Sequence, residues 1–127
     1  MARSAHNDVL DDGLDAMKTA VDSATGSQIV CSSEPATYAA ALAAALATQT
    51  NPDLTIADDT SGRKATVSAA TAVSITASGN ATHIALVESV GTKLWFVTTC
   101  TPQDLVSGGT VDIPAWKVNV KDPTAPA

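Results

Sequence analysis

A stripe of apolar residues near the N-terminus predicts the first helix. Leu10, Leu14, Met17 and Val21 recur at intervals of four, three and four residues, which places them on one helical face. A helix of this length is only marginally stable alone in water, so its apolar face must be covered by another surface. We therefore interpret residues 1–22 as a helical arm, and we expect Leu10, Leu14 and Met17 to contact a partner.

A second helix is predicted in an alanine-rich segment. Tyr38, Leu42 and Leu46 follow one another at intervals of four residues, and the surrounding alanines favour helix by propensity. Pro35 stands near the expected first turn, where proline is well tolerated. The predicted helix covers residues 34–48.

From Leu54 onward the apolar pattern changes to alternation with period two, interrupted by turns rich in glycine, serine and aspartate. This spacing is typical of antiparallel strands in a sandwich or barrel. Residues 28–31 form one further short strand before the alanine-rich segment. The segment 94–99 is apolar on both faces over its first half, so we expect it to be the central strand of a sheet.

In the last apolar segment, the apolar residues shift from odd-numbered to even-numbered positions. Val111 and Ile113 occupy odd positions, whereas Trp116 and Val118 occupy even ones. A strand that continued straight through would turn one of these two sets to solvent. We therefore predict a bulge or bend at Pro114-Ala115, which is also where a proline within a strand is tolerated.

These patterns predict a mainly β fold, an antiparallel β-sandwich or jelly-roll-like domain with an N-terminal helix and a short alanine-rich helix. The sandwich is one domain over residues 28–122 that includes the helix at 34–48, and residues 123–127 form an exposed tail. Thirteen of the 24 alanines precede residue 48, so the strand region supplies most of the large core side chains.

Charge and composition narrow the function. The net charge is −6, with 13 acidic and 7 basic side chains, which argues against a surface that tracks nucleic-acid phosphates. The longest apolar run is short and mostly alanine, so no membrane span is expected. Aspartates stand where a signal peptide would carry its apolar segment, so we expect a protein made in the cytoplasm.

Few residues suggest chemistry. Cys31 and Cys100 follow predicted strands and form either one long-range disulfide or two buried thiols. His6 and His83 are too few and too far apart for a zinc site with these cysteines, and there is no nucleophile motif. We therefore expect no metal, no cofactor and no enzymatic activity. The acidic pair Asp58-Asp59 is interpreted as a turn rather than a calcium or acid–base site.

The two tryptophans are the remaining candidates for recognition. An exposed tryptophan stacks on a sugar or anchors a partner, whereas a buried one fills the core. At least one is expected in the core because the chain has only four aromatic residues. Trp116 follows the predicted bend, and both a core position and an interface position stay open for it.

Several segments together carry a resemblance to a known group of proteins. They are LTIAD at 54–58, SGRK at 61–64, ASGNATHIAL at 77–86, FVTTC at 96–100 and GTVDIPAW at 109–116. This succession resembles small structural proteins of tailed bacteriophages, and the likeness covers residues 28–123. The shared segments are turn-and-strand patterns without catalytic residues.

The resemblance implies a virion component, and its size and β domain look most like a capsid decoration, or cement, protein. Such a protein is expected on the outer capsid surface, commonly as a homotrimer, where it binds the major capsid protein and stabilises contacts between capsid subunits. One alternative is a host-surface or glycan-binding module of a head or tail fibre, which predicts exposed aromatics in a groove. Another is a minor tail or head-completion protein.

Overall fold

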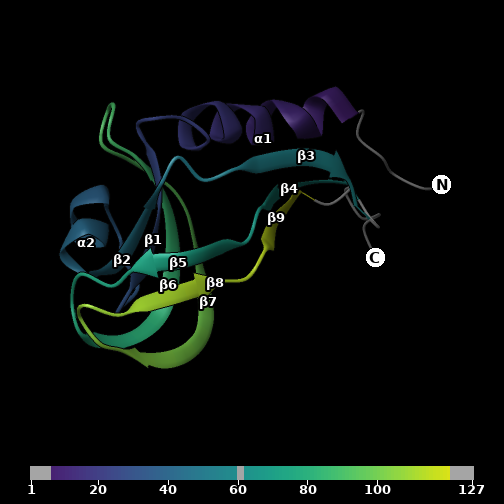
Figure 1. Cartoon of the computed structure of the whole chain (residues 1–127). Helices are drawn as coiled ribbons and strands as arrows, with labels where there is room; N and C mark the ends of the chain where they lie inside the picture. The colour runs from purple at the N-terminus through teal and green to yellow at the C-terminus, as the bar shows by residue number, and fades with distance from the viewer. Residues whose placement is uncertain (1–6, 60–61, 121–127) are drawn as a thin grey trace, which may run out of the picture.

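The computed structural model describes residues 7–59 and 62–120, with the side chains of the first helix described from Gly13 onward. Two short helices accompany a strand-rich chain, as Figure 1 shows. The helices are α1 (Asn7–Val21) and α2 (Tyr38–Ala43). The strands are β1 (Gly26–Cys31), β2 (Ala45–Thr50), β3 (Leu54–Asp58), β4 (Arg63–Val67), β5 (Ala70–Ser74), β6 (Gly79–Glu88), β7 (Lys93–Leu105), β8 (Thr110–Ile113) and β9 (Trp116–Val120).

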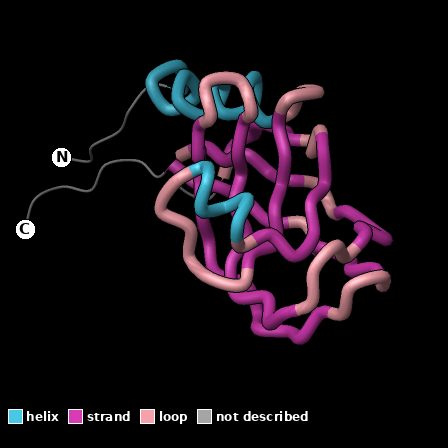
Figure 2. Tube along the Cα trace, turned by 90° about the vertical axis from the view of Figure 1, so that its left-hand side faces the viewer, coloured by secondary structure: helices cyan, strands magenta, loops and turns pink. Residues whose placement is uncertain are grey.

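The first layer of the fold is a four-stranded antiparallel sheet in the order β2-β1-β6-β7. Its two inner strands, β1 and β6, contain runs of consecutive apolar residues that are buried on both faces. Figure 2 shows α2 in front of these strands and α1 across their end. Side chains on the α2 side include Ile29, Cys31 and Ala85, which pack with Ala41 of the helix.

The second layer consists of two short sheets that continue each other. One has the order β3-β4-β9 and the other pairs β5 with β8. Val67 pairs with Trp116 and Ala70 pairs with Ile113, so the register is unbroken across the gap between the two sheets. Figure 1 shows β4 leading into β5 beside β8 leading into β9. The second layer is therefore one long antiparallel ribbon, bent at residues 68–69 and 114–115, with β3 at its side.

The layers close on one side and pack through two apolar clusters. Ala47 forms a bridge with Ile75, and the Thr76 N–H donates to the Leu46 carbonyl at 2.8 Å, which joins β2 to the end of β5. Between the layers, one cluster centres on Val30, Ile84 and Ile113. The other contains Leu54, Val67, Leu86 and Val118. The predicted mainly β, antiparallel architecture with an N-terminal helix is confirmed, and its arrangement is sandwich-like.

Helix α1 is part of this domain. Its side chains Leu14, Met17 and Val21 are buried in the cluster that also contains Leu54 and Leu86. The end of α1 also forms hydrogen bonds with β3, and Figure 1 shows the helix beside that strand. The apolar face is thus covered by the chain itself, which removes the reason for interpreting it as an arm. Leu10 lies within α1, but its side chain is outside the described residues.

Two charged side chains at the end of α1 bind the backbone of β3. The Lys18 Nζ donates to the Leu54 carbonyl at 2.7 Å, and Asp22 Oδ2 accepts from the Leu54 N–H at 3.0 Å. Lys18 and Asp22 also form an ion pair at 2.9 Å. Burial acts to raise the pKa of Asp22, but the hydrogen bond from Leu54 and the Lys18 ammonium together hold that pKa below its usual value.

The helix predicted at 34–48 is wrong in extent. Thr37 caps α2, its Oγ1 accepting from the Ala40 N–H at 3.1 Å, and the helix ends at Ala43. Residues 45–50 are strand β2, in which Ala47 pairs with Val30. Alanine favours a helix by propensity and is less common in strands, so the pairing with β1 overrides the local preference here.

The predicted central strand is also wrong. The segment 94–99 belongs to β7, which is the edge strand of the first layer. Its apolar character on both faces has another cause: Leu94 and Val97 pack on the α2 side, whereas Phe96 packs between the layers. Coverage of the two faces of a strand is independent of whether both its edges are paired.

The parity change at Pro114-Ala115 is confirmed as a bend. It separates β8 from β9, so the strand is interrupted rather than bulged. Ile113 and Val118 are both buried in spite of their opposite parity. His6 and the predicted tail at 123–127 lie outside the described residues. Neither helix described is long and apolar enough to cross a membrane.

Candidate functional site

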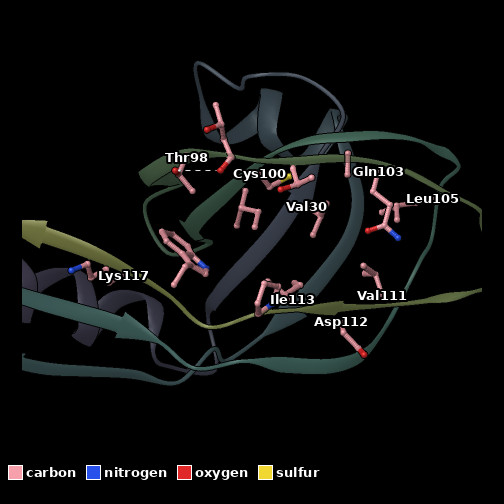
Figure 3. A pocket seen from close by; sticks show the side chains of 15 residues that line it. Val30, Thr98, Cys100, Gln103, Leu105, Val111, Asp112, Ile113 and Lys117 are labelled. Atoms are coloured by element: carbon pink, nitrogen blue, oxygen red, sulfur yellow. Dashed lines mark hydrogen bonds between the residues drawn. The ribbon is translucent and has the colours of Figure 1, made fainter.

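The side of the sandwich opposite the β2–β5 closure is open, and a cavity of about 500 Å³ lies there. Figure 3 shows its lining side chains extending from β7 on one side and from β8 on the other, with Val30 of β1 between them. We call this cavity the β7–β8 groove. Its lining residues are Val30, Ala81, Ile84, Thr98, Thr99, Cys100, Thr101, Gln103, Leu105, Val111, Asp112, Ile113, Pro114, Trp116 and Lys117.

The groove reaches the edges of both strands. Thr98, Thr99, Cys100 and Thr101 are consecutive in sequence and all line it, as do residues 111–114. Successive side chains of a regular strand point to opposite faces. Thr98 and Thr99 therefore share the cavity because it meets the edge of β7, as residues 111–113 do at the edge of β8, whereas β7 departs from regular pairing after Thr99. Within the described residues, β7 pairs only with β6, and β8 pairs only with β5.

The groove wall is mainly apolar, and it carries one acidic side chain without an ion pair, Asp112, and one paired basic side chain, Lys117. Val30, Ile84 and Ile113 form its floor as members of the core cluster between the layers. Two charged residues stand at the rim, and Figure 3 shows both side chains directed away from the cavity. The Lys117 Nζ pairs with Asp59 Oδ2 at 2.6 Å. Asp112 Oδ1 accepts from the Ala72 N–H at 2.8 Å, where β5 departs from regular pairing.

Hydroxyl and amide groups add polar positions along β7. Figure 3 shows Thr98 and Gln103 on the same side of the groove, together with the Thr98 hydroxyl hydrogen bond. The Thr98 Oγ1 donates to the Thr99 carbonyl at 3.5 Å. The groove thus combines an apolar floor with neutral hydrogen-bonding groups, which is the composition typical of binding sites.

Trp116 stands at the end of the groove, where it combines a core position with a place in the cavity lining, and its role at an interface stays a prediction. It packs against both inter-layer clusters and also lines the groove. The indole Nε1 donates to Gln28 Oε1 at 2.6 Å, and the ring stacks on Phe96 with centroids 6.0 Å apart. Gln28 is fully buried, and its Nε2 donates to Gln49 Oε1 at 2.8 Å.

Trp95 lies elsewhere. Leu86 pairs with Phe96 and Val87 pairs with Leu94, so Trp95 is an extra residue in a bulge of β7. It packs against the cluster beneath α1, and the Lys93 Nζ lies 5.6 Å from its ring centroid. Its Nε1 is buried without a hydrogen-bond partner among the described residues.

Both cysteines are free thiols, so the structure holds two thiols rather than a disulfide. Cys31 belongs to the cluster on the α2 side, whereas Cys100 packs on the opposite face and lines the groove. Burial and the neighbouring Cys100 raise the pKa of Cys31 to about 11. Burial also raises the pKa of Cys100, which is only partly covered.

The structure therefore brings two of the predicted site residues, Trp116 and Cys100, to one groove. Leu14 and Met17 belong to the buried face of α1, so their side chains are unavailable to a partner. Sequence reasoning missed Thr98, Gln103 and Val111. The shift of apolar residues from odd to even positions beside Trp116 indicated the bend at the groove. No local pattern in the sequence shows that this bend lies opposite β7.

The acidic pair and the histidine have internal partners. Asp58 pairs with Arg63 at 2.6 Å, and Asp59 accepts from Lys117 and from Asn119 Nδ2, the latter at 2.7 Å. His83 is half-buried in β6, with its Nδ1 2.9 Å from the Thr82 hydroxyl. Among the side chains described, no three His, Cys, Asp or Glu gather in a way that could hold a metal ion.

Comparisons with protein-family models, curated proteins and solved structures found no significant match. The fold and the site define a class of protein: a two-layer β protein with a mainly apolar groove at its open edge.

Proposed function

We propose that this protein is a structural virion component that binds the outer surface of a tailed-phage capsid and stabilises contacts between major capsid subunits. The observation that carries the proposal is the β7–β8 groove, an open and mainly apolar surface at the edge of the β domain. The sequence resemblance over residues 28–123 supports the identity of the partner. The role requires binding and no catalytic step.

The attachment surface differs from the one that the helical stripe suggested. Leu14 and Met17 are committed to the core, whereas the groove exposes apolar and neutral polar groups together. Burying such a surface releases water from its apolar groups. A capsid presents many copies of each site, so modest single contacts add up through effective concentration, particularly if the protein is a homotrimer.

The test is the copy number of this chain in purified virions, measured by quantitative gel densitometry against the major capsid protein. Hundreds of copies per particle support the proposal, whereas a few copies indicate a tail or head-completion protein and overturn it. Purified protein is also sedimented with capsids that lack it. Failure to cosediment overturns the proposal, and the bound mass gives the stoichiometry of the site.

A glycan-binding role is the second candidate because Trp116 shares the groove with threonine hydroxyls and Gln103. Aromatic rings with neutral hydrogen-bonding groups beside them suit sugar recognition. Binding to an array of bacterial surface glycans, lost on Trp116→Ala and retained on Trp95→Ala, would favour this role. Capsid binding that free glycans do not displace would exclude it as the basis of attachment.

A further inference from the structure

We infer that the β7–β8 groove binds an extended polypeptide segment of the partner, whose backbone pairs with the free strand edges and whose alternate apolar side chains enter the cavity. The identity of the partner as a capsid subunit rests on the proposed function. The mode of binding does not rest on the proposed function, because it follows from the unpaired edges of β7 and β8 and from the side chains that line the groove.

The first argument is the exposure of two edges at one cavity. Residues 98–101 and 111–114 line the groove consecutively, so backbone N–H and C=O groups of both strands are accessible from it. Neither outer edge has a strand partner in the part of the chain that is described. An extended segment is the ligand that satisfies a row of unpaired backbone groups and also presents side chains at every second position.

The second argument is the length of regular edge that is available. Pairing with β6 is regular from Phe96 to Thr99, between the bulge at Trp95 and an irregularity that includes Pro102. Bulges and proline residues limit the length over which an edge strand can pair with another chain, which prevents aggregation. Here they leave a short regular window, of which Thr98 and Thr99 line the cavity. A window of this length suits a short docked segment and disfavours open-ended aggregation.

The third argument is charge. The two charged groups at the rim, Lys117 and Asp112, already bind Asp59 and the Ala72 N–H. Asp112 keeps its negative charge, and the Lys117 ammonium is already paired. An acidic side chain of an incoming segment would therefore lose its water without gaining a free cationic partner in the groove. The occupant is thus a segment without acidic side chains that alternates apolar and small polar residues.

The occupant is a segment of another protein rather than of a second copy. Residues 121–127 contain two prolines and no apolar side chain larger than proline, so they could not fill the cavity.

The experiment compares two threonine variants. Thr98→Asp introduces a charge inside the groove, and Thr55→Asp makes the same change at an exposed site of β3, the edge strand on the far side of the second layer. Both are checked for folding by circular dichroism. We expect Thr98→Asp to weaken capsid binding by at least about ten-fold and Thr55→Asp to leave it unchanged. Equal binding by both variants overturns the inference while the proposed function stands.

Two protection measurements identify the mode of binding. Strand pairing should slow amide hydrogen exchange within residues 96–99 and 111–113 on the capsid. It should also slow alkylation of Cys100 by at least about ten-fold, because that thiol lines the groove. Protection of Cys100 without slower amide exchange would overturn strand pairing in favour of a side-chain or sugar ligand. The same protection in the isolated protein, accompanied by a doubled mass, would overturn the hetero-partner in favour of a second copy.

If the wild-type protein does not bind capsids, the proposed function fails and the inference is tested separately. A displayed library of random 12-residue peptides is then selected on the purified protein. Enriched peptides with alternating apolar residues, which bind the wild type and Thr55→Asp but not Thr98→Asp, support the inference. Enrichment of acidic or non-alternating peptides, or of none, overturns it.

Discussion

Trp116 of β9 donates a hydrogen bond of 2.6 Å to the side-chain carbonyl of Gln28 in β1. The bond crosses from the second layer to the first and joins residues that are 88 positions apart. Phe96 holds the other side of the indole by stacking. Because Gln28 is fully buried and also bound to Gln49, the position of Trp116 at the groove is determined by the core rather than by solvent.

The two tryptophans should therefore respond differently to the same substitution. Trp116→Phe removes the donor from a buried carbonyl oxygen, which costs about 1–3 kcal/mol beyond the lost ring contacts. Trp95→Phe removes a buried N–H that has no partner among the described residues, so its loss is smaller. Urea unfolding of both variants at neutral pH measures the difference. Equal losses would show that the hydrogen bond to Gln28 contributes nothing net.

Two glycines should give opposite effects when replaced by alanine. A Cβ at Gly26 would lie 1.8 Å from the Val21 carbonyl oxygen, so Gly26→Ala should destabilise the fold by about 3 kcal/mol. A Cβ at Gly13, within α1, would meet no atom within 4 Å, and Gly13→Ala should stabilise by about 0.5–1 kcal/mol through helix propensity. Thermal unfolding monitored by circular dichroism measures both. A stabilising Gly26→Ala would contradict the close approach of β1 to the end of α1.

Asp22 should make stability depend on acid pH. Its pKa is lower in the folded state than its ordinary value of 3.8, so its stabilising effect is fully present above that value. The effect is lost as the pH falls through the lower, folded pKa. Asp22→Asn should therefore cost about 1–2 kcal/mol at pH 7, and the difference from wild type should shrink below about pH 4.

The matched control is Asp15→Asn, which removes the same charge from an exposed position of α1. Urea unfolding of both variants is measured at pH 7, 5 and 3. A difference between Asp22→Asn and wild type that persists unchanged at pH 3 would show that the contacts to Leu54 and Lys18 do not depend on the ionised carboxylate.

The cysteines should differ in reactivity. With a pKa of about 11, Cys31 is roughly 0.1% thiolate at pH 8 and is also fully buried, so the folded protein should not alkylate there. Cys100 is partly exposed in the groove and should react slowly, becoming the first site modified by iodoacetamide. Peptide mass spectrometry of native and urea-unfolded samples distinguishes the two sites. Faster native labelling of Cys31 would contradict the packing of β1 beneath α2.

Local patterns determined much of the fold. The spacing of Leu14, Met17 and Val21 was enough for α1, because helical periodicity needs no knowledge of what covers the face. The parity change at Pro114-Ala115 was enough for the bend between β8 and β9, because both flanking strands must bury one face. Both signals are contained in a few consecutive residues.

Tertiary pairing decided the rest. Residues 45–47 became strand because β1 lies beside them, although their composition suits a helix as well. Segment 94–99 became an edge strand because a covered face says nothing about a paired edge. The groove exists only because β7 and β8, joined by a short turn, pair with different strands and leave their facing edges free. By itself, then, the sequence determined which face of each helix or strand is apolar. Which elements pack or pair with one another was decided by contacts between distant segments, and local periodicity does not encode those contacts.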